Sequence, residues 1–195
     1  MRLNASPLGD GIVPASSGDS LLAALKFSTD VLRKEGVPYV LIGAWALAVW
    51  GRPRATMDLD LLLLVNETEL RRIGTRMEQA GMTVDEEWLD SNPLLKGSLL
   101  RLRRHGVTID LLRPRDLHDR QVFRRRRRKR LDRRFYWVVA AEDFILQKLK
   151  VGRPRDFEDA LSVMKRSAPI LDRAYLRRWA RRLGIASELD YLLSL

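Results

Sequence analysis

Two aspartates, Asp58 and Asp60, carry the clearest chemical signal in the sequence. They stand two positions apart in the run 56–65, which predicts a strand, so both carboxylates leave the same face. Two carboxylates on one face repel, and each raises the pKa of the other unless a cation lies between them. The strand continues into a run of leucines, where charge is costly unless it has a use. A divalent metal that holds a phosphate for in-line attack is such a use.

A third carboxylate, Asp110, lies within the apolar run 107–112, which predicts a strand of a hairpin. If this strand lies beside the one with Asp58, three carboxylates converge and can hold magnesium. Asp110 would then also polarise the hydroxyl group of an acceptor. The alternative is that Asp58 and Asp60 are solvent-facing strand residues and that Asp110 closes a turn.

The residues before the aspartate pair favour a phosphate ligand. Gly43 separates a predicted strand from a predicted helix, whose first N–H groups and positive dipole attract anions. Arg52 and Arg54 stand just upstream of the carboxylates, where guanidinium groups can face anionic oxygens.

The amino-acid composition limits which metal sites and which partners are expected. The 195 residues carry a net charge of +11, which favours an anionic partner such as a nucleoside triphosphate or nucleic acid. Cysteine is absent, so disulfides and thiolate metal sites are excluded. His105 and His118 are the only histidines, which makes a histidine-built zinc site improbable. A metal here is expected on carboxylates, and oxygen ligands select Mg²⁺ or Mn²⁺.

The chain carries no signal for export or membrane insertion. The first residues form no secretory apolar region. The longest apolar run, 39–50, is too short to span a bilayer. We therefore expect a cytoplasmic protein without a membrane partner.

The order of the predicted elements indicates an α/β (α+β) fold, a small mixed sheet flanked by helices. We expect a flexible leader over 1–18, a core over 19–140 and a helical carboxyl-terminal portion over 141–195. Strands are predicted at 39–42, 56–65, 82–86, 98–103, 107–112 and 135–139, and helices at 20–36, 44–50, 67–80 and from 141 onward, with breaks at 152–154, 169 and 184.

Three motifs in this order resemble a known family. The stretch 43–60 is similar to the signature of nucleotidyltransferase-fold proteins of the AbiEii-like toxin group, in the DNA polymerase beta superfamily. That signature has Gly-Gly or Gly-Ser at a helix start and then Arg-x-Thr-x-Asp-x-Asp, which matches 54–60. The run 107–112 resembles the strand with the third acid. The segments 141–148 and 152–159 resemble the family's carboxyl-terminal lysine and Arg-x-x-Asp-x-x-Asp element.

The resemblance implies the nucleotidyltransferase fold and the transfer of a nucleotide from a triphosphate, with metal on Asp58, Asp60 and Asp110. It implies that Asp156 holds Lys148 or the nucleotide in place, whereas the alternative for both residues is helix surface electrostatics. This sequence departs from the family at Ala44, where a second Gly or a Ser is usual, and it has no counterpart of the large helical extension of the longer toxins. The implied substrate contacts are Gly43, Ala44, Arg54, Thr56, Lys148 and Asp156.

A basic run from Arg124 to Arg130, continued by Arg133 and Arg134, is the second strong feature of the sequence. Such a run would neutralise several phosphates and bind RNA with strong salt dependence. The aromatic triplet 135–137 lies close enough for stacking, although its alternation favours the core. The alternative for the run is a solvated, arginine-rich helix.

Three classes of function follow. The first is a toxin-like nucleotidyltransferase that acts on RNA, which the resemblance implies to be a tRNA 3′ end, and that a cognate antitoxin would neutralise. The second is a small-molecule nucleotidyltransferase like those that inactivate lincosamide or aminoglycoside antibiotics, although a cationic drug calls for an acidic cleft. The third is a non-catalytic or antitoxin-like module, against which the costly cluster of intact aspartates argues.

Overall fold

The computed structural model describes residues 17–195, and most of the expected leader over 1–18 lies outside them. A seven-stranded mixed sheet forms the centre, in the order β3-β4-β5-β2-β1-β7-β6. Strand β2 is the middle strand, which buries its leucines between the helices on the two faces. The strands are β1 (Tyr39–Leu41), β2 (Asp58–Leu63), β3 (Thr83–Val84), β4 (Leu99–Arg104), β5 (Val107–Leu112), β6 (Arg127–Leu131) and β7 (Arg134–Val138).

Two pairings decide where the functional residues meet. Strand β2 runs antiparallel to β1, with Leu41 opposite Leu61. It runs parallel to β5 on its other side, with Asp60 opposite Asp110. Strands β4 and β5 form the predicted hairpin, which turns at His105 with φ 46°. The hairpin prediction is therefore confirmed.

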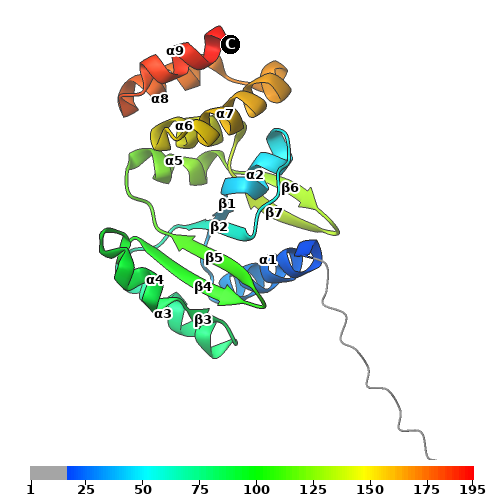
Figure 1. Ribbon diagram of the computed structural model, residues 1–195, viewed down its shortest axis with the longest axis vertical. Helices are drawn as coiled ribbons and strands as arrows, with labels where there is room; N and C mark the ends of the chain where they lie inside the picture. The colour runs from blue at the N-terminus through cyan, green and yellow to red at the C-terminus, as the bar shows by residue number, and fades with distance from the viewer. Residues whose placement is uncertain (1–16) are drawn as a thin grey trace, which may run out of the picture.

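Helices cover both faces of the sheet (Figure 1). α1 and α3 lie on one side, while α2 and the later helices α5–α9 lie on the other, and α4 packs against β4. The carboxyl-terminal portion is helical, as predicted. The helices are α1 (Ser17–Lys34), α2 (Gly43–Trp50), α3 (Glu67–Gln79), α4 (Glu86–Ser91), α5 (Leu117–Arg125), α6 (Ala141–Val151), α7 (Pro154–Ser167), α8 (Arg173–Leu183) and α9 (Ala186–Ser194), with short 3₁₀ turns at Pro93–Leu95 and Ala168–Ile170.

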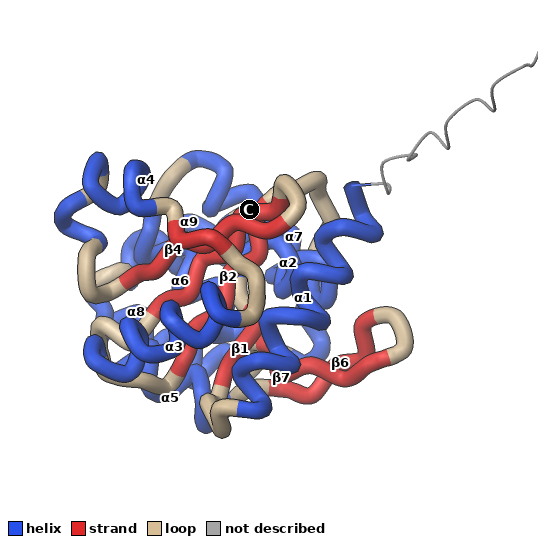
Figure 2. The backbone as a smooth tube through the Cα atoms, turned by 90° about the horizontal axis from the view of Figure 1, so that it is seen from below, coloured by secondary structure: helices blue, strands red, loops and turns tan. Residues whose placement is uncertain are grey.

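The basic run does not form the arginine-rich helix that was its alternative interpretation. Helix α5 ends at Arg125, and the residues from Arg127 onward form the edge strand β6, paired with β7. A sheet edge with charged side chains resists pairing with other chains, which explains a strand of such polar composition. The β6–β7 hairpin projects beside the helical body (Figure 2).

The aromatic triplet is only partly in the core. Tyr136 is buried, whereas Phe135 is 57% and Trp137 is 38% exposed. Neighbouring residues of a strand face opposite sides, so burial of Tyr136 places the other two rings outward. The expectation that the triplet belongs to the core therefore holds for Tyr136 and not for Phe135 or Trp137.

None of the helices within residues 17–195 combines the length and apolarity that crossing a bilayer requires.

Candidate active site

The three predicted aspartates lie on two adjacent strands. Asp58 and Asp60 share a face of β2, and Asp60 stands directly opposite Asp110 of β5 in the parallel register. Neighbouring strands are about 4.8 Å apart, so the two carboxylates are next to each other. Asp110 is a mid-strand residue and closes no turn, so the alternative interpretation of it is wrong.

The carboxyl group of Asp60 has a strongly perturbed pKa. Burial raises the pKa of Asp60 to about 6, and the charges of Asp110 and Asp58 contribute to this rise, while Lys148 and Arg101 oppose the shift. The ionised form is thus poorly compensated by the protein alone. A cation bound between the carboxylates would supply the missing compensation.

Asp110 is held by a neighbouring arginine. Nε and Nη2 of Arg101, on β4, donate to the two carboxylate oxygens of Asp110 at 2.8 and 2.7 Å. The guanidinium group also lies 3.6 Å from the centre of the Trp88 ring. These two contacts fix the orientation of Asp110, and each carboxylate oxygen keeps a further lone pair for a metal or a proton.

Gly43 begins α2 immediately beside Asp60. It has φ +62°, and a Cβ atom at this position would lie 1.9 Å from Oδ2 of Asp60. Only glycine permits both the left-handed backbone and this approach. No side chain caps the helix start, so its first N–H groups are available to an anion. Ala44, the departure from the family pattern, is buried.

A cleft of about 300 Å³ opens in front of Gly43 and Asp60. Its walls come from the ends of β1, β2 and β5 and from α5, α6 and α7. Five basic side chains line it against three acidic ones, a balance that suits a polyanionic ligand. The basic residues are Arg113, Arg115, Lys148, Lys150 and Arg153, and the acidic ones are Asp60, Asp119 and Asp156.

Sequence reasoning missed most of these cleft cations. Arg113 and Arg115 directly follow the strand that carries Asp110, and the end of that strand faces the cleft. Their position after a strand with a candidate catalytic acid was a usable signal. Arg153 is the arginine of the Arg-x-x-Asp-x-x-Asp element in 152–159, so the sequence did give a signal for it. Lys150 gave no comparable signal, because its placement depends on how α6 packs.

Lys148 lies in the cleft and is held by two acids of α7. Its Nζ is 2.8 Å from Oδ1 of Asp156 and 2.8 Å from Oδ2 of Asp159. Burial alone would raise the pKa of Asp156, but hydrogen bonds from Arg153 and Lys148 outweigh it and hold that pKa below the usual value. Both acids are buried, so the alternative of surface electrostatics is wrong.

Arg54 and Thr56 make contacts outside the cleft. The guanidinium group of Arg54 donates to both oxygens of Asp159 at 3.2 Å. The hydroxyl oxygen of Thr56 accepts from the N–H of Asp58 at 3.1 Å and donates to its carbonyl oxygen at 3.3 Å. Neither residue lines the cleft, so in this structure they support Asp159 and the start of β2. Their predicted substrate contacts remain expectations.

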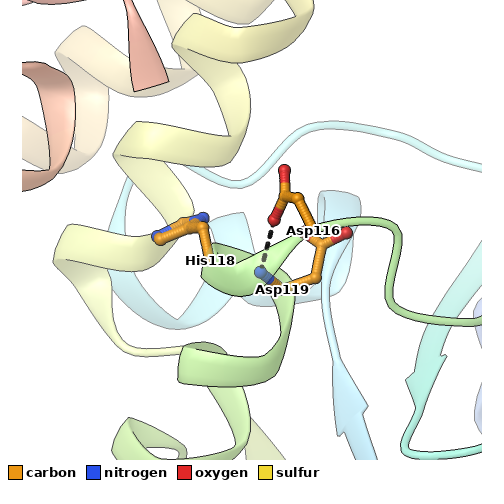
Figure 3. A group of neighbouring side chains, drawn as sticks. All are labelled: Asp116, His118 and Asp119. Atoms are coloured by element: carbon orange, nitrogen blue, oxygen red, sulfur yellow. Dashed lines mark hydrogen bonds between the residues drawn. The ribbon is translucent and has the colours of Figure 1, made fainter. Parts of the chain in front are cut away.

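A second group of possible ligands lies at the start of α5 (Figure 3). Asp116, His118 and Asp119 offer atoms within 4.8 Å of one another. Figure 3 shows the two aspartates together, with the N–H of Asp119 bonded to Asp116, and the imidazole ring extending to the other side. Nζ of Lys150 lies 2.5 Å from Asp116 and 3.5 Å from Asp119. This ammonium group already occupies the position of a cation, so the cluster gives no reason to place a metal there.

Comparison with known proteins supports the predicted fold. No model of a protein family matches the sequence, and the curated proteins give no match. Solved structures do match. The antibiotic-resistance factor ANT(2″)-Ia superimposes with a TM-score of 0.58 over 89% of this chain and 97% of its own, at 14% identity. The same protein in complex with adenylyl-2″-tobramycin gives a TM-score of 0.54 at 12% identity, over 88% of this chain and 98% of its own.

The lincosamide antibiotic adenylyltransferase LnuA, bound to lincomycin, also matches. It covers 74% of this chain and 94% of its own, with a TM-score of 0.50 and 15% identity. At such identities the similarity concerns the fold and leaves the AbiEii-like assignment a prediction. The chain has the fold of the nucleotidyltransferases, a mixed sheet flanked by helices.

Proposed function

We propose that the chain is a metal-dependent nucleotidyltransferase that moves a nucleoside monophosphate from a nucleoside triphosphate to a hydroxyl acceptor. The observation that carries this proposal is the register of β2 and β5, which sets Asp60 opposite Asp110 on the face shared with Asp58, beside Gly43. Carboxylate oxygens are the ligands that Mg²⁺ and Mn²⁺ prefer. The poorly compensated charge of Asp60 fits such an ion.

The three aspartates and the residues that line the cleft would each have a role in this reaction. Asp58, Asp60 and Asp110 would hold the metal, which supplies charge neutralisation at the phosphate and at the leaving oxygen. Gly43 leaves room for the Asp60 carboxylate at the start of α2, whose first N–H groups would bind phosphate oxygens, and Lys148 would balance their charge. These contacts would orient a triphosphate in the basic cleft, with its α-phosphorus near the three acids.

The transfer step exchanges one phosphorus–oxygen bond for another. The acceptor oxygen forms a bond to the α-phosphorus, and the bond from that phosphorus to the oxygen of the β-phosphate breaks. Pyrophosphate leaves, and the proton of the acceptor hydroxyl passes to Asp110 or through it to water. Arg101 holds the Asp110 carboxylate in a fixed direction for this task.

We infer RNA, and within RNA the tRNA 3′ end, as the first acceptor to test. The net charge of +11 and the basic cleft support a polyanionic partner. The resemblance of three motifs to AbiEii-like toxins supports the further proposal of a toxin that a cognate antitoxin neutralises. Growth arrest on expression of the chain, relieved by Asp58→Ala, would be expected of such a toxin.

A small-molecule acceptor is the second candidate, and one observation favours it. ANT(2″)-Ia and LnuA superimpose along nearly their whole lengths. An aminoglycoside carries several positive charges, and the basic lining of the cleft argues against it unless the triphosphate neutralises that lining first.

One experiment tests both the reaction and the acceptor. The protein is incubated with each α-labelled triphosphate, Mg²⁺ or Mn²⁺, and either total RNA or an aminoglycoside and lincosamide panel. Label in tRNA that disappears in Asp58→Ala supports the RNA proposal. Label that enters only a drug would overturn the RNA proposal and support the small-molecule acceptor. Asp190→Ala, an exposed acid of α9, is the matched control and should keep full transfer. Absence of label from every acceptor would overturn the proposed function.

A further inference from the structure

A groove of about 450 Å³ lies between α1 and the β6–β7 hairpin, apart from the catalytic cleft. It borders the residues that lead into β1, whereas Gly43 and the acids lie where β1 ends. Its hairpin wall at β6 is also three strand positions from β2, roughly 14 Å at the usual spacing. The groove is therefore a second site, and it is called the hairpin groove below.

The charge of the hairpin groove favours an anion. Four arginines, Arg33, Arg126, Arg128 and Arg134, line it against a single acid, Asp30. Asp30 accepts hydrogen bonds from Arg134 at 2.9 and 3.0 Å and also pairs with Arg33. No carboxylate within the described residues pairs with Arg126 or Arg128, so their charges are left for a ligand.

Exposed aromatic rings accompany these free cations. The guanidinium carbon of Arg126 lies 4.6 Å from the centre of the Trp137 ring, and that of Arg128 lies 4.8 Å from the centre of the Phe135 ring. The two rings belong to the outward face of β7. A flat ring beside a flat guanidinium group offers a platform on which a nucleobase can stack, with phosphates on the arginines.

Two polar atoms in the walls of the groove have no partner. Among the described residues, the buried Nε of Arg126 and the buried hydroxyl of Tyr136 make no hydrogen bond. Both residues line the hairpin groove. Buried polar groups without partners cost free energy, so the walls of the groove hold hydrogen-bonding capacity that the described residues leave unused.

We propose that the hairpin groove binds single-stranded RNA, with phosphates on Arg126 and Arg128 and bases stacked on Phe135 and Trp137. This deepens the proposed function and rests on it, because it gives the RNA acceptor a docking surface remote from the transfer chemistry. Duplex RNA keeps its bases stacked inside the helix and cannot use the aromatic rings. The groove thus distinguishes single strands from duplexes.

The test measures binding without catalysis. A labelled single-stranded RNA of roughly 12 nucleotides, within the range of sites on such surfaces, is titrated with the full chain, without triphosphate or metal. Phe135→Ala, whose ring is exposed, is expected to weaken binding at least about fivefold while thermal unfolding stays unchanged. Arg126→Ser with Arg128→Ser should flatten the slope of log affinity against log salt by roughly 1.4.

The control removes the same charge elsewhere. Arg177→Ser with Arg181→Ser deletes two exposed arginines of α8, and binding should stay close to that of the unchanged protein. Equal losses in both double variants would mean non-specific attraction and would overturn the proposal, as would duplex RNA that binds as tightly as the single strand. The binding test is independent of the labelling experiment, because it measures no transfer. If the protein binds the RNA in this test but transfers no label in the other, the proposed function is refuted and the binding site stands.

Discussion

Gly43 and Asp60 approach each other so closely that a methyl group on the glycine would lie 1.9 Å from the carboxylate oxygen Oδ2. The backbone of Gly43 is left-handed, with φ +62°, and its peptide is where α2 begins. The contact joins the proposed phosphate-binding turn to the proposed metal ligand. Any side chain at this position must displace the aspartate.

Gly43→Ala is therefore expected to reduce transfer by roughly 100-fold or more, since a shift of about 1 Å at reacting groups has that effect. The matched control is Gly184→Ala. Gly184 has φ +70°, and a methyl group there would meet nothing within 4 Å, so it bears the same backbone strain without the clash. The control should lose about 1 kcal/mol of stability and keep full activity. Steady-state kinetics measure the transfer activity of the two variants, and urea unfolding measures their stability. Full activity in Gly43→Ala would contradict the prediction.

The stability of the metal-free protein should depend on the protonation of Asp60. Its pKa of about 6 in the folded state lies above the ordinary value near 4, because burial and the neighbouring acids disfavour the charge. Between these values the folded chain binds a proton that the unfolded chain has lost, so stability falls as the pH rises through this window. The loss is at most about 3 kcal/mol.

Asp60→Asn should remove that dependence and stabilise the metal-free protein at neutral pH. Urea unfolding at about pH 4.5 and about pH 7 measures the difference. Magnesium should stabilise the unchanged protein at neutral pH and leave Asp60→Asn unaffected, because only the former has the full ligand set. Identical pH profiles for the two proteins would show that Asp60 does not carry the effect.

Lys148 joins the cleft to the buried acids of α7, so its removal should affect both stability and transfer. Lys148→Met leaves Asp156 and Asp159 without their shared ammonium group, and we expect a loss of about 3 kcal/mol. The double variant with Asp156→Asn should recover part of the stability and none of the transfer. Lys165→Met, at an exposed position of α7, should change neither, and a Lys148→Met protein with normal transfer would exclude the phosphate role.

Arg101 is expected to act through Asp110 as a positioning residue. Arg101→Lys keeps the positive charge but loses the bidentate hydrogen bonds to Asp110 and the stacking of the guanidinium group on the Trp88 ring. We expect kcat to fall about tenfold or more with little change in the KM for the triphosphate. Arg103→Lys, on the same strand and paired with Asp85, is the control. A rise in KM with constant kcat would point to direct triphosphate binding by Arg101.

Much of the local structure was predictable from the sequence. The i, i+2 spacing of Asp58 and Asp60 in an apolar run determined that both acids share a face of a strand. The hairpin around His105 and the helix start at Gly43 likewise follow from short-range patterns. Such features depend on a few neighbouring residues, whose side-chain periodicity and backbone preferences act locally.

Tertiary structure decided which of these pieces meet. The parallel pairing of β2 with β5, which sets Asp60 opposite Asp110, joins segments far apart in the chain and leaves no trace in either strand alone. The strand β6 forms because β7 offers a partner, although its arginines lack an apolar alternation. Arg54 pairs with Asp159 for the same reason, since long-range packing and not local spacing chooses the partner of a charged side chain.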